Sequence, residues 1–389
     1  MSKLPLLSRL KSSEIKGKII FLRLDLNVSI LQGKISDDFR LVRIIPTIEY
    51  IRSMGGKIII GAHMESEGME TLEEVHHYLN AKLPVKFIKV HPRKLDRSMF
   101  DAMRDGEIAL LENLRRDEGE KSNDESFSRH LAGLADVYVN DAFSSSHREH
   151  ASIVGVPRFI PGYMGLLFEE EYNHMSRCRR PKKPYLAIVG GAKFETKFAL
   201  VKKLLVIADN IFLCGALAND VYRRRGMEIG RSFQSESNIN LDAIMESKKV
   251  SLPTDALVED IGDPIYKNIE EVKSDEMIVD SGPESLEVLR QLVSEARFIL
   301  WNGPLGLYEK GYTDATLKTA KMILESGAES VMGGGDTLTA ISKIKAEVLG
   351  EDEETQKRHF LSTGGGAMLE FLASGTLAGI KALSTSTKH

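Results

Sequence analysis

Three glycines followed by an aspartate form the stretch of this sequence with the clearest chemical potential. The residues Ser330–Met332 lead into Gly333–Gly335, and Asp336 and Thr337 follow directly. Apolar residues then recur at helical spacing, so the pattern predicts a strand, a tight turn and a helix. The N–H groups and positive dipole end of such a helix favour an anion such as phosphate. Asp336 would repel a bare phosphate, which indicates a divalent cation between them. The alternative is a tight connection with an ordinary Asp cap.

Four further predicted strands in the second half of the chain end at glycine. These glycines are Gly190 and Gly191, Gly215, Gly303, and Gly364–Gly366. Because ligands bind beyond the carboxyl ends of strands in an open parallel sheet, five such ends predict a phosphate cradle. Lys193 follows the first glycine pair and could meet a migrating phosphoryl group. Lys197 lies one helical turn further and could reach the same ligand; the alternative is an exposed helical lysine.

The first half carries cations, carboxylates and amides where its predicted strands end. They are Arg23, Asp25, Asn27, His63, Asn113, Arg115, Asn140, Asp141, His147 and Arg148, with Arg40 beside a predicted helix. Collected at one sheet edge, they would form a basic basin for a small anionic substrate. Taken singly, the arginines also fit solvated surface charges, and His63 fits a hydrogen-bonded structural residue.

Short apolar strands that alternate with helices must position these side chains. The predicted strands are Lys18–Leu24, Lys57–Ala62, Pro84–Val90, Glu107–Leu111, Asp136–Val139, Tyr185–Val189, Asn210–Leu213, Lys249–Leu252, Arg297–Trp301, Ser330–Met332 and His359–Leu361. Predicted helices include Leu41–Met54, Met69–Leu79 and Glu125–Leu134. This rhythm predicts an α/β protein with two Rossmann-like domains, whose parallel sheets are covered by helices.

The length of 389 residues exceeds one typical hydrophobic core, so two domains are expected. We expect the first domain over residues 1–160, a connecting hinge helix over 161–180 and the second domain over 181–368. Pro181 and Pro184 end the connecting helix, because proline cannot continue one.

Composition restricts the partners and the compartment. The 52 Lys and Arg residues nearly balance the 56 Asp and Glu residues, leaving a net charge of −4. We therefore expect no nucleic-acid partner. No apolar run approaches the roughly 18 residues of a membrane helix, so no membrane partner is expected either. Two cysteines without metal-ligand spacing fit a reducing cytoplasm.

The two kinds of strand end together indicate phosphoryl transfer. Glycine turns would hold a polyphosphate in one domain, and arginines with a histidine would hold a small anion in the other. Two such domains facing each other across a hinge would suit a reaction that depends on positioning and charge neutralisation.

Nine motifs, in order, resemble those of the phosphoglycerate kinase family along nearly the whole chain. They are Arg23–Val28, Arg40–Ile48, Leu111–Arg115, Val139–Phe143, His147–Ala151, Gly190–Lys193, Trp301–Gly306, Gly333–Thr337 and Ser362–Ala367. The resemblance implies reversible phosphoryl transfer between 1,3-bisphosphoglycerate and Mg-ADP, giving 3-phosphoglycerate and Mg-ATP. It also implies Mg²⁺ bound with the nucleotide, and we expect a monomer.

The resemblance further implies roles for individual residues. Substrate binding is implied for Asp25, Asn27, Arg40, His63, Arg115 and Arg148. Nucleotide binding is implied for Lys197, Asn302, Pro304, Glu309, Gly334, Gly335, Asp336 and Thr337, with Asp336 on the metal. Arg40 and Lys193 would be catalytic, assisted at the transition state by Gly333, Gly364 and Gly365. The C-terminal segment 369–389 would return to the first domain.

The sequence departs from the family pattern in three places. Where the family has S-H-L-G-R-P, this chain has the acidic loop Ala62–Glu67, which lacks the arginine that helps to bind the substrate phosphate. Losing a charge-assisted hydrogen bond worth roughly 1.5–3 kcal/mol would weaken binding about tenfold to a hundredfold. Arg116 or Arg43 could compensate. Cys214–Leu217 replaces G-G-G-M on the nucleotide side, and Ser144 and Ser145 replace Gly-Thr.

Two functions therefore stay open at this point. The first is an active phosphoglycerate kinase with a rebuilt substrate edge, which the retained Arg40, Lys193, Lys197 and Asp336 favour. The second is a non-catalytic paralogue with a binding or regulatory role, which the acidic loop favours.

Overall fold

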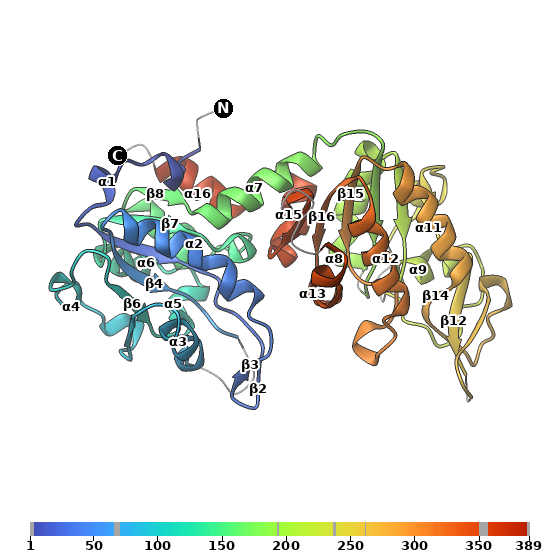
Figure 1. Ribbon diagram of the computed structural model, residues 1–389, viewed down its shortest axis with the longest axis horizontal. Helices are drawn as coiled ribbons and strands as arrows, with labels where there is room; N and C mark the ends of the chain where they lie inside the picture. Colours follow the sequence, from blue (N-terminus) through green and yellow to red (C-terminus); the bar gives the residue numbers. More distant parts are fainter. Residues whose placement is uncertain are drawn as a thin grey trace. The chain divides into compact units, whose positions relative to one another are not determined.

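The computed structural model describes residues 4–65, 71–192, 194–235, 239–260, 262–349 and 357–386. By its contacts the chain divides into two compact units (Figure 1). Unit 1 comprises Met1–Asn173 and Thr376–His389, and unit 2 comprises His174–Gly375. Helix α7 (Leu166–Cys178) contains the boundary between them. Within the described residues, none of the helices has both the length and the apolar character that a membrane crossing requires.

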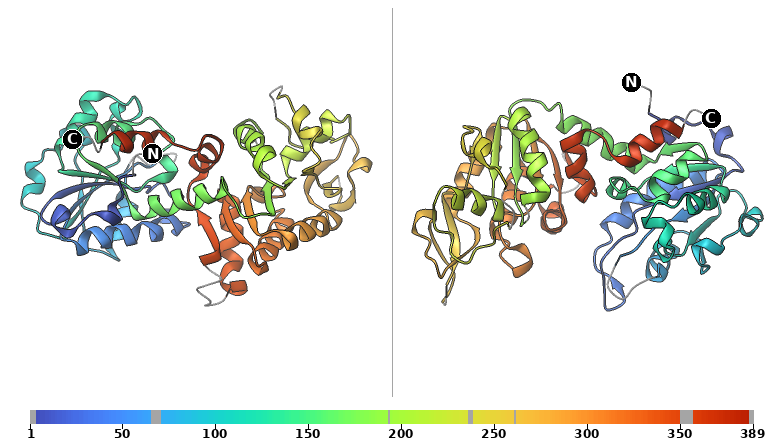
Figure 2. Two further views of the ribbon diagram at one scale, coloured as in Figure 1. Left: turned by 90° about the horizontal axis from the view of Figure 1, so that it is seen from above. Right: turned by 180° about the vertical axis from the view of Figure 1, so that it is seen from behind.

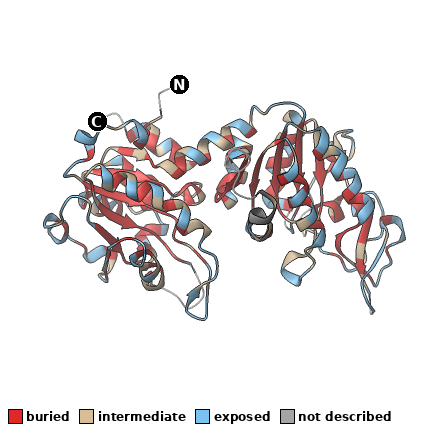
Figure 3. Ribbon diagram, in the orientation of Figure 1, coloured by how far each residue is buried: buried red, intermediate tan, exposed pale blue. Residues whose placement is uncertain are grey.

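Unit 1 is built on a six-stranded parallel sheet. Its spatial order is β5 (Val85–Ile88), β6 (Ile108–Leu111), β4 (Lys57–Gly61), β1 (Ile19–Arg23), β7 (Val137–Asn140) and β8 (Gly162–Met164). Every residue of β1, β6 and β7 is buried, as Figure 3 shows for the strands of this sheet. Such continuous apolar strands are typical of a parallel sheet covered on both faces.

The helices of unit 1 pack on this sheet and at its ends. They are α1 (Ser12–Ile15), α2 (Phe39–Ser53), α3 (Glu73–Asn80), α4 (Ser98–Asp101), α5 (Glu118–Lys121), α6 (Glu125–Gly133) and α16 (Ala378–Ser386), with a β2 (Ile30–Leu31) and β3 (Lys34–Ile35) hairpin. The C-terminal helix α16 contacts the turn η5 (Ala151–Gly155), and Gly379 N donates to Ser146 O at 2.8 Å. Residues far apart in sequence thus complete one unit.

Unit 2 contains a second six-stranded parallel sheet. Its spatial order is β11 (Val250–Ser251), β10 (Asn210–Leu213), β9 (Tyr185–Val189), β15 (Phe298–Asn302), β16 (Glu329–Gly333) and β17 (His359–Ser362). Figure 2 shows helices on both faces of it. They are α8 (Phe194–Ile207), α9 (Ala216–Arg224), α10 (Asp242–Met245), α11 (Pro283–Glu295), α12 (Asp314–Glu325), α13 (Gly335–Leu349) and α15 (Gly365–Ser374).

The predicted α/β class with two helix-covered parallel sheets is confirmed, and two features of the elements differ from expectation. The connecting helix begins at Leu166 rather than at residue 161, because Gly162–Met164 pairs with β7 as strand β8. The sequence analysis also missed an antiparallel sheet formed by β12 (Asp255–Glu259), β13 (Ile265–Asn268) and β14 (Met277–Ser281). The domain boundaries 160, 180 and 368 stay predictions.

Candidate active site

The carboxyl ends of four neighbouring strands in unit 1 bring most of the predicted basin residues to one edge. Strands β6, β4, β1 and β7 are adjacent in the sheet. Within two residues of their ends lie Asn113, His63, Asp25 and Asp141. Because all four strands are parallel, these side chains share the edge at which α/β proteins bind ligands.

Asp25 organises one part of this edge. Its Oδ2 lies 2.9 Å from Arg40 Nη1, and its Oδ1 accepts a 3.1 Å hydrogen bond from Asn27 N. Arg40 Nη1 also donates to Asn27 O at 3.1 Å, and Ser144 Oγ donates to Asp25 Oδ2. Three of the predicted substrate residues therefore form one hydrogen-bonded group. The sequence analysis noted Ser144 only as a departure, yet its hydroxyl belongs to this group.

A buried chain of polar residues lies behind the basin. The fully buried Arg23 donates from Nε to Ser152 Oγ at 2.8 Å and contacts His63 Nδ1 from Nη2 at 3.0 Å. Ser152 Oγ donates in turn to the buried Glu120 Oε1 at 2.6 Å. Burial lowers the pKa of His63 far below its usual range, and Arg23, Arg115 and Arg148 lower it further. His63 is therefore neutral, with Nδ1 as the acceptor from Arg23 and the proton on Nε2.

Glu65 lies among the cations of the basin. Its Oε2 contacts Arg115 Nη1 and lies 3.6 Å from Arg148 Nη1, while its Oε1 lies 3.7 Å from Lys121 Nζ. The hydrogen bond from Arg115 lowers the pKa of Glu65, and the charges of Lys121 and Arg148 act in the same direction. Two predicted substrate arginines thus share an intramolecular carboxylate.

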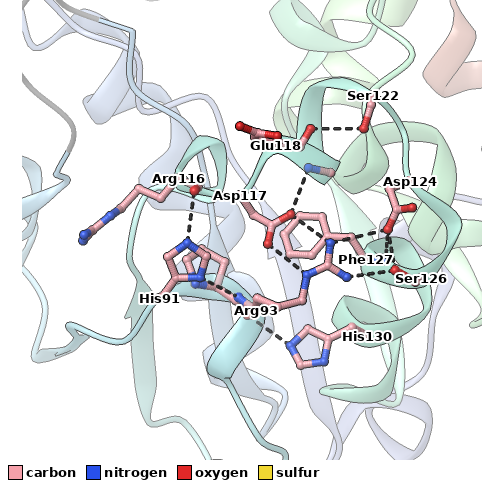
Figure 4. A network of polar contacts seen from close by, with 12 residues as sticks. His91, Arg93, Arg116, Asp117, Glu118, Ser122, Asp124, Ser126, Phe127 and His130 are labelled. Atoms are coloured by element: carbon pink, nitrogen blue, oxygen red, sulfur yellow. Dashed lines mark hydrogen bonds and ion pairs between the residues drawn. The ribbon is translucent and has the colours of Figure 1, made fainter.

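A surface network fixes the segment that carries Arg115 and Lys121 (Figure 4). Arg93 donates from Nε and Nη2 to the two carboxylate oxygens of Asp117, both at 2.9 Å. Asp117 caps α5, which ends at Lys121. Arg93 Nη1 also donates to Ser126 Oγ on α6 at 2.9 Å. The bidentate geometry restricts both partners, so α5 is held against α6.

The two arginines that could compensate for the missing family arginine pair with other carboxylates. Arg116 Nη1 lies 3.5 Å from Glu112 Oε2, and Figure 4 shows its side chain pointing away from the Arg93 network. Arg43 Nη2 donates to Glu170 Oε2 at 2.8 Å. The cations that surround Glu65 are Arg115, Arg148 and Lys121, and adjacency in sequence did not turn Arg116 toward them.

Glycine turns shape the corresponding edge of unit 2. Gly303 follows β15 with φ +95°, and a Cβ there would lie 2.5 Å from Lys197 Nζ. Gly334 follows β16 with φ +107° and begins the turn into α13. Side chains rarely adopt such angles, so both positions require glycine. At Gly303, the absence of a side chain also lets Gly190 O and Lys197 Nζ approach the backbone closely.

Lys197 lies beneath these turns. Its Nζ donates to Gly190 O and, at 3.4 Å, to Asn302 O, and the residue is 9% exposed. Burial lowers the pKa of Lys197 to about 8, although Cys214 and Asp336 oppose the shift. The alternative of an exposed helical lysine is therefore wrong. Asn302 Nδ2 also donates to Gly333 O at 3.1 Å, which connects β15 to β16.

A pocket at this edge gathers several predicted nucleotide residues. Pro304, Glu309 and Asp336 line it together with Gly191 and Gly215. Oγ1 of the buried Thr337 accepts a 3.2 Å hydrogen bond from Gly303 N and so stabilises the turn after β15. Partial burial raises the pKa of Asp336, and the negative charge of Glu309 raises it further. A bound cation would offset both the desolvation of the Asp336 carboxylate and its repulsion by Glu309.

A metal ion would need further ligands beside Asp336. Within the described parts of the chain, no group of three or more His, Cys, Asp or Glu side chains could hold a metal ion. Mg²⁺ commonly binds through one or two carboxylates plus substrate phosphates and water. The single half-buried carboxylate of Asp336 fits that mode of binding.

The remaining predicted residues of unit 2 are placed as follows. Gly364 follows β17 and precedes α15, and Gly365 has φ +50°. Gly333 ends β16, where an added Cβ would collide with Met368 Sδ. Gly335 is the first residue of α13 and is exposed. Lys193 lies outside the described residues.

Comparison with known proteins places this chain among its relatives. The family model for phosphoglycerate kinase matches residues 10–375. The chain belongs to the phosphoglycerate kinase family. It is 36% identical to phosphoglycerate kinase of Leptospira biflexa, over 98% of both chains, and 36% identical to that of Dictyoglomus turgidum, over 96% of this chain and 97% of that one.

Solved phosphoglycerate kinase structures have the same fold. The Coxiella burnetii protein matches with a TM-score of 0.82 and 32% identity over the whole of both chains. The Pyrococcus horikoshii protein matches with a TM-score of 0.85 and 29% identity, over 99% of this chain and all of that chain.

Of the three residues that depart from the family pattern on the nucleotide side, only Ala216 lines this pocket. Leu217 is fully buried in α9, so its side chain belongs to the core, whereas Ala216 lines the pocket. Cys214 is also fully buried, and burial raises the pKa of its thiol to about 12. The thiol is therefore neutral at physiological pH.

Three contributors to the basin escaped the sequence analysis. Lys121, Glu120 and Ser144 come from α5 and from the turn after β7. Lys121 follows the strand-end residue Arg115 by six positions, so a search restricted to strand ends missed it. A search for charges in the helix that follows each strand could have found Lys121 and Glu120.

Proposed function

We propose that this protein catalyses reversible phosphoryl transfer between 1,3-bisphosphoglycerate and Mg-ADP, giving 3-phosphoglycerate and Mg-ATP. One observation carries the proposal. In this phosphoglycerate kinase family member, cationic side chains gather at the carboxyl ends of the parallel strands of unit 1, and glycine turns with Lys197 lie at those of unit 2.

On the substrate side, we assign the phosphoglycerate to the basin of unit 1. Arg115 and Arg148 would bind its phosphate, and the neutral His63 would donate from Nε2. Asp25 and Asn27 would orient the ligand, because their contacts with Arg40 fix them at the edge. Arginine suits this role because its planar fork matches phosphate and carboxylate oxygens.

On the nucleotide side, we assign the phosphates to the glycine turns and Lys197. Pro304, Asn302 and Glu309 would line the nucleotide site, and the N–H groups of Gly334–Thr337 would face the phosphates. Asp336 would hold the magnesium ion of the nucleotide, which neutralises phosphate charge when it is bound. The raised pKa of Asp336 beside Glu309 supports a cation there.

The reaction needs alignment and charge neutralisation more than a protein nucleophile. A carboxylate oxygen of 3-phosphoglycerate forms a bond to the γ-phosphorus of ATP, while the bond from that phosphorus to the ADP oxygen breaks. Arg40 and Lys193 would neutralise the transferring group, and the glycine turns at Gly333, Gly364 and Gly365 would donate N–H groups to it.

The non-catalytic alternative has one observation in its favour. Glu65 lies beside Arg115 and Arg148, which the substrate would need. The positive charge of the basin is therefore already partly neutralised. A protein that binds a ligand without turning it over would tolerate such a residue. Retained Lys197 and Asp336, placed beside the same turns, support the enzyme instead.

A coupled assay with 3-phosphoglycerate and Mg-ATP tests the proposal. We expect ADP formation that requires both substrates and Mg²⁺, and we expect Lys193→Ala to lower turnover by orders of magnitude with a far smaller loss of nucleotide binding. Lys202→Ala on the exposed face of α8 is the control and should keep normal turnover. Normal turnover of Lys193→Ala would contradict its catalytic role.

We further propose a cytoplasmic monomer. Cys178 and Cys214 are buried and form no disulfide, which supports a reducing compartment. Light scattering of the purified protein tests the monomer, which would have a mass of 43.3 kDa.

A further inference from the structure

Hydrogen bonds hold the backbone of Met64 and Glu65 in place. Glu65 N donates to Asn27 Oδ1 at 3.0 Å. The preceding residue, Met64, accepts from Asn113 Nδ2 at 3.0 Å and donates to Asn113 Oδ1 at 3.3 Å. Asn113 also accepts from Arg115 N at 3.1 Å. The loop that presents Glu65 is thus hydrogen-bonded to the segment that presents Arg115, so their contact is built into the local fold.

The cations around Glu65 differ in how much they depend on it. The Arg115 side chain is only 6% exposed; its Nε is buried without a hydrogen-bond partner, and its Nη1 contacts Glu65 Oε2. Arg148 and Lys121 are 38% and 60% exposed and can turn to solvent. A buried guanidinium requires a nearby anion. Glu65 supplies that anion to Arg115 in the ligand-free protein.

The Glu65 carboxylate is itself 53% exposed, so another anion can replace it. A phosphate that approached Arg115 and Arg148 would meet a negative charge of the protein at the same nitrogen atoms. The Glu65 carboxylate and the phosphate repel each other when both approach these donors. The carboxylate must therefore move away for the phosphate to bind. We propose that Glu65 is a resident anion that competes with the substrate phosphate for Arg115 and Arg148 and thereby sets the affinity of this basin.

This inference rests on the proposed function for the identity of the substrate. It predicts that the protein binds this substrate more tightly when Glu65 loses its charge. Glu65→Gln keeps the size of the side chain and removes its charge, so 3-phosphoglycerate no longer displaces a carboxylate. We expect the Kd for 3-phosphoglycerate to fall about tenfold or more. Glu65→Ala, which also removes the charge, should give a gain of the same kind.

Isothermal titration calorimetry without nucleotide measures this directly in the full chain. The matched control is Glu125→Gln, because Glu125 forms an exposed ion pair with Arg129 on α6. We expect its Kd to stay within about twofold of the parent. Inorganic sulfate, as a second probe, should also bind more tightly to both Glu65 variants.

Steady-state kinetics separate a specific competition from a general structural effect. The KM for 3-phosphoglycerate should fall in Glu65→Gln, whereas the KM for ATP should stay unchanged. Unchanged or weaker binding of 3-phosphoglycerate by folded Glu65→Gln and Glu65→Ala would overturn the inference, even if the parent is an active enzyme. Tighter binding by these variants would support it, even if no protein turned over ATP and the proposed function failed.

Discussion

At the scale of single residues, the fold shifts the pKa of the Lys197 ammonium group toward neutral pH. Burial lowers its pKa from 10.5 to about 8, and its Nζ is held by carbonyl oxygens beneath the glycine turns. The unfolded chain therefore binds this proton more tightly between pH 8 and 10.5, and this residue adds stability as pH rises through that window. The proposed role of Lys197 at the nucleotide phosphates needs the protonated form, so we expect nucleotide binding to follow the opposite trend.

We predict that the Kd for Mg-ADP rises above about pH 8, by up to tenfold per pH unit, because binding then takes up one proton. Titration calorimetry between pH 7 and pH 9.5 measures it. Lys197→Met should bind weakly at all pH values and lose the trend, whereas Lys202→Met should keep it. A parent Kd independent of pH would show that Lys197 does not contact the phosphates as a cation.

Asp336 carries the second prediction at this scale. Asp336→Asn should remove most of the tightening that Mg²⁺ gives to ATP binding, because the carboxylate is the hard ligand at the β16 turn. ATP titrations with and without Mg²⁺ measure the effect. Asp314→Asn is the control, since Asp314 occupies the first turn of α12 and pairs with Lys318. An equal Mg²⁺ effect in Asp336→Asn and the parent would rule out this role for Asp336.

Residues whose positions follow from their own strand ends could be predicted from the sequence. Gly303 and Lys197 lie where the local pattern places them, since a strand, a turn and a helix suffice to define both. The contact between Glu65 and Arg115 could not be predicted. It depends on two separate loops whose relative position is fixed by Asn113 and Asn27.

At the scale of elements, α5 positions much of the basin although it has only four residues. Its N-cap Asp117 is nearly buried and is held by Arg93, whose guanidinium also lies 4.8 Å from the ring of Phe127. Lys121 ends this helix, and the buried Glu120 accepts from Ser152. The stability of a short helix depends on such tertiary contacts rather than on its own propensity.

We predict that Arg93→Ala lowers the free energy of unfolding by roughly 1–3 kcal/mol, because nearly buried Asp117 loses a bidentate partner. The KM for 3-phosphoglycerate should rise with it, since Arg115 and Lys121 lose their support. Denaturant unfolding and steady-state kinetics measure the two effects. Arg290→Ala removes an exposed ion pair with Glu287 and should change stability by less than about 0.5 kcal/mol. Equal effects of the two substitutions would contradict the positioning role of Arg93.

The elements also show where sequence patterns stop being informative. Parallel strands such as β9 and β10 are short apolar runs, and their bounds were predicted correctly. The antiparallel sheet was missed although β12 and β14 contain short apolar runs; its third strand, β13, is largely exposed. Strand β8 was missed because Gly162–Met164 is short and precedes a strong helical pattern.

At the scale of the whole molecule, length and the alternation of strands and helices were enough to predict two α/β units. Each unit completes its own sheet, and we propose an anion-binding edge for each. The return of α16 to unit 1 has no local signal, because it depends on packing against the distant turn η5. The functional claim for the whole molecule is that a phosphoryl group passes between the two ligands.

Formation of ATP from 1,3-bisphosphoglycerate and Mg-ADP is the most direct measurement of that claim. Luminescent detection of ATP would follow the reaction, with 1,3-bisphosphoglycerate generated in place. The account predicts ATP formation that requires this protein, both substrates and Mg²⁺, and that nearly disappears in Lys193→Ala. Binding of both ligands by the parent protein without any ATP formation would contradict the account and identify a non-catalytic member of the family.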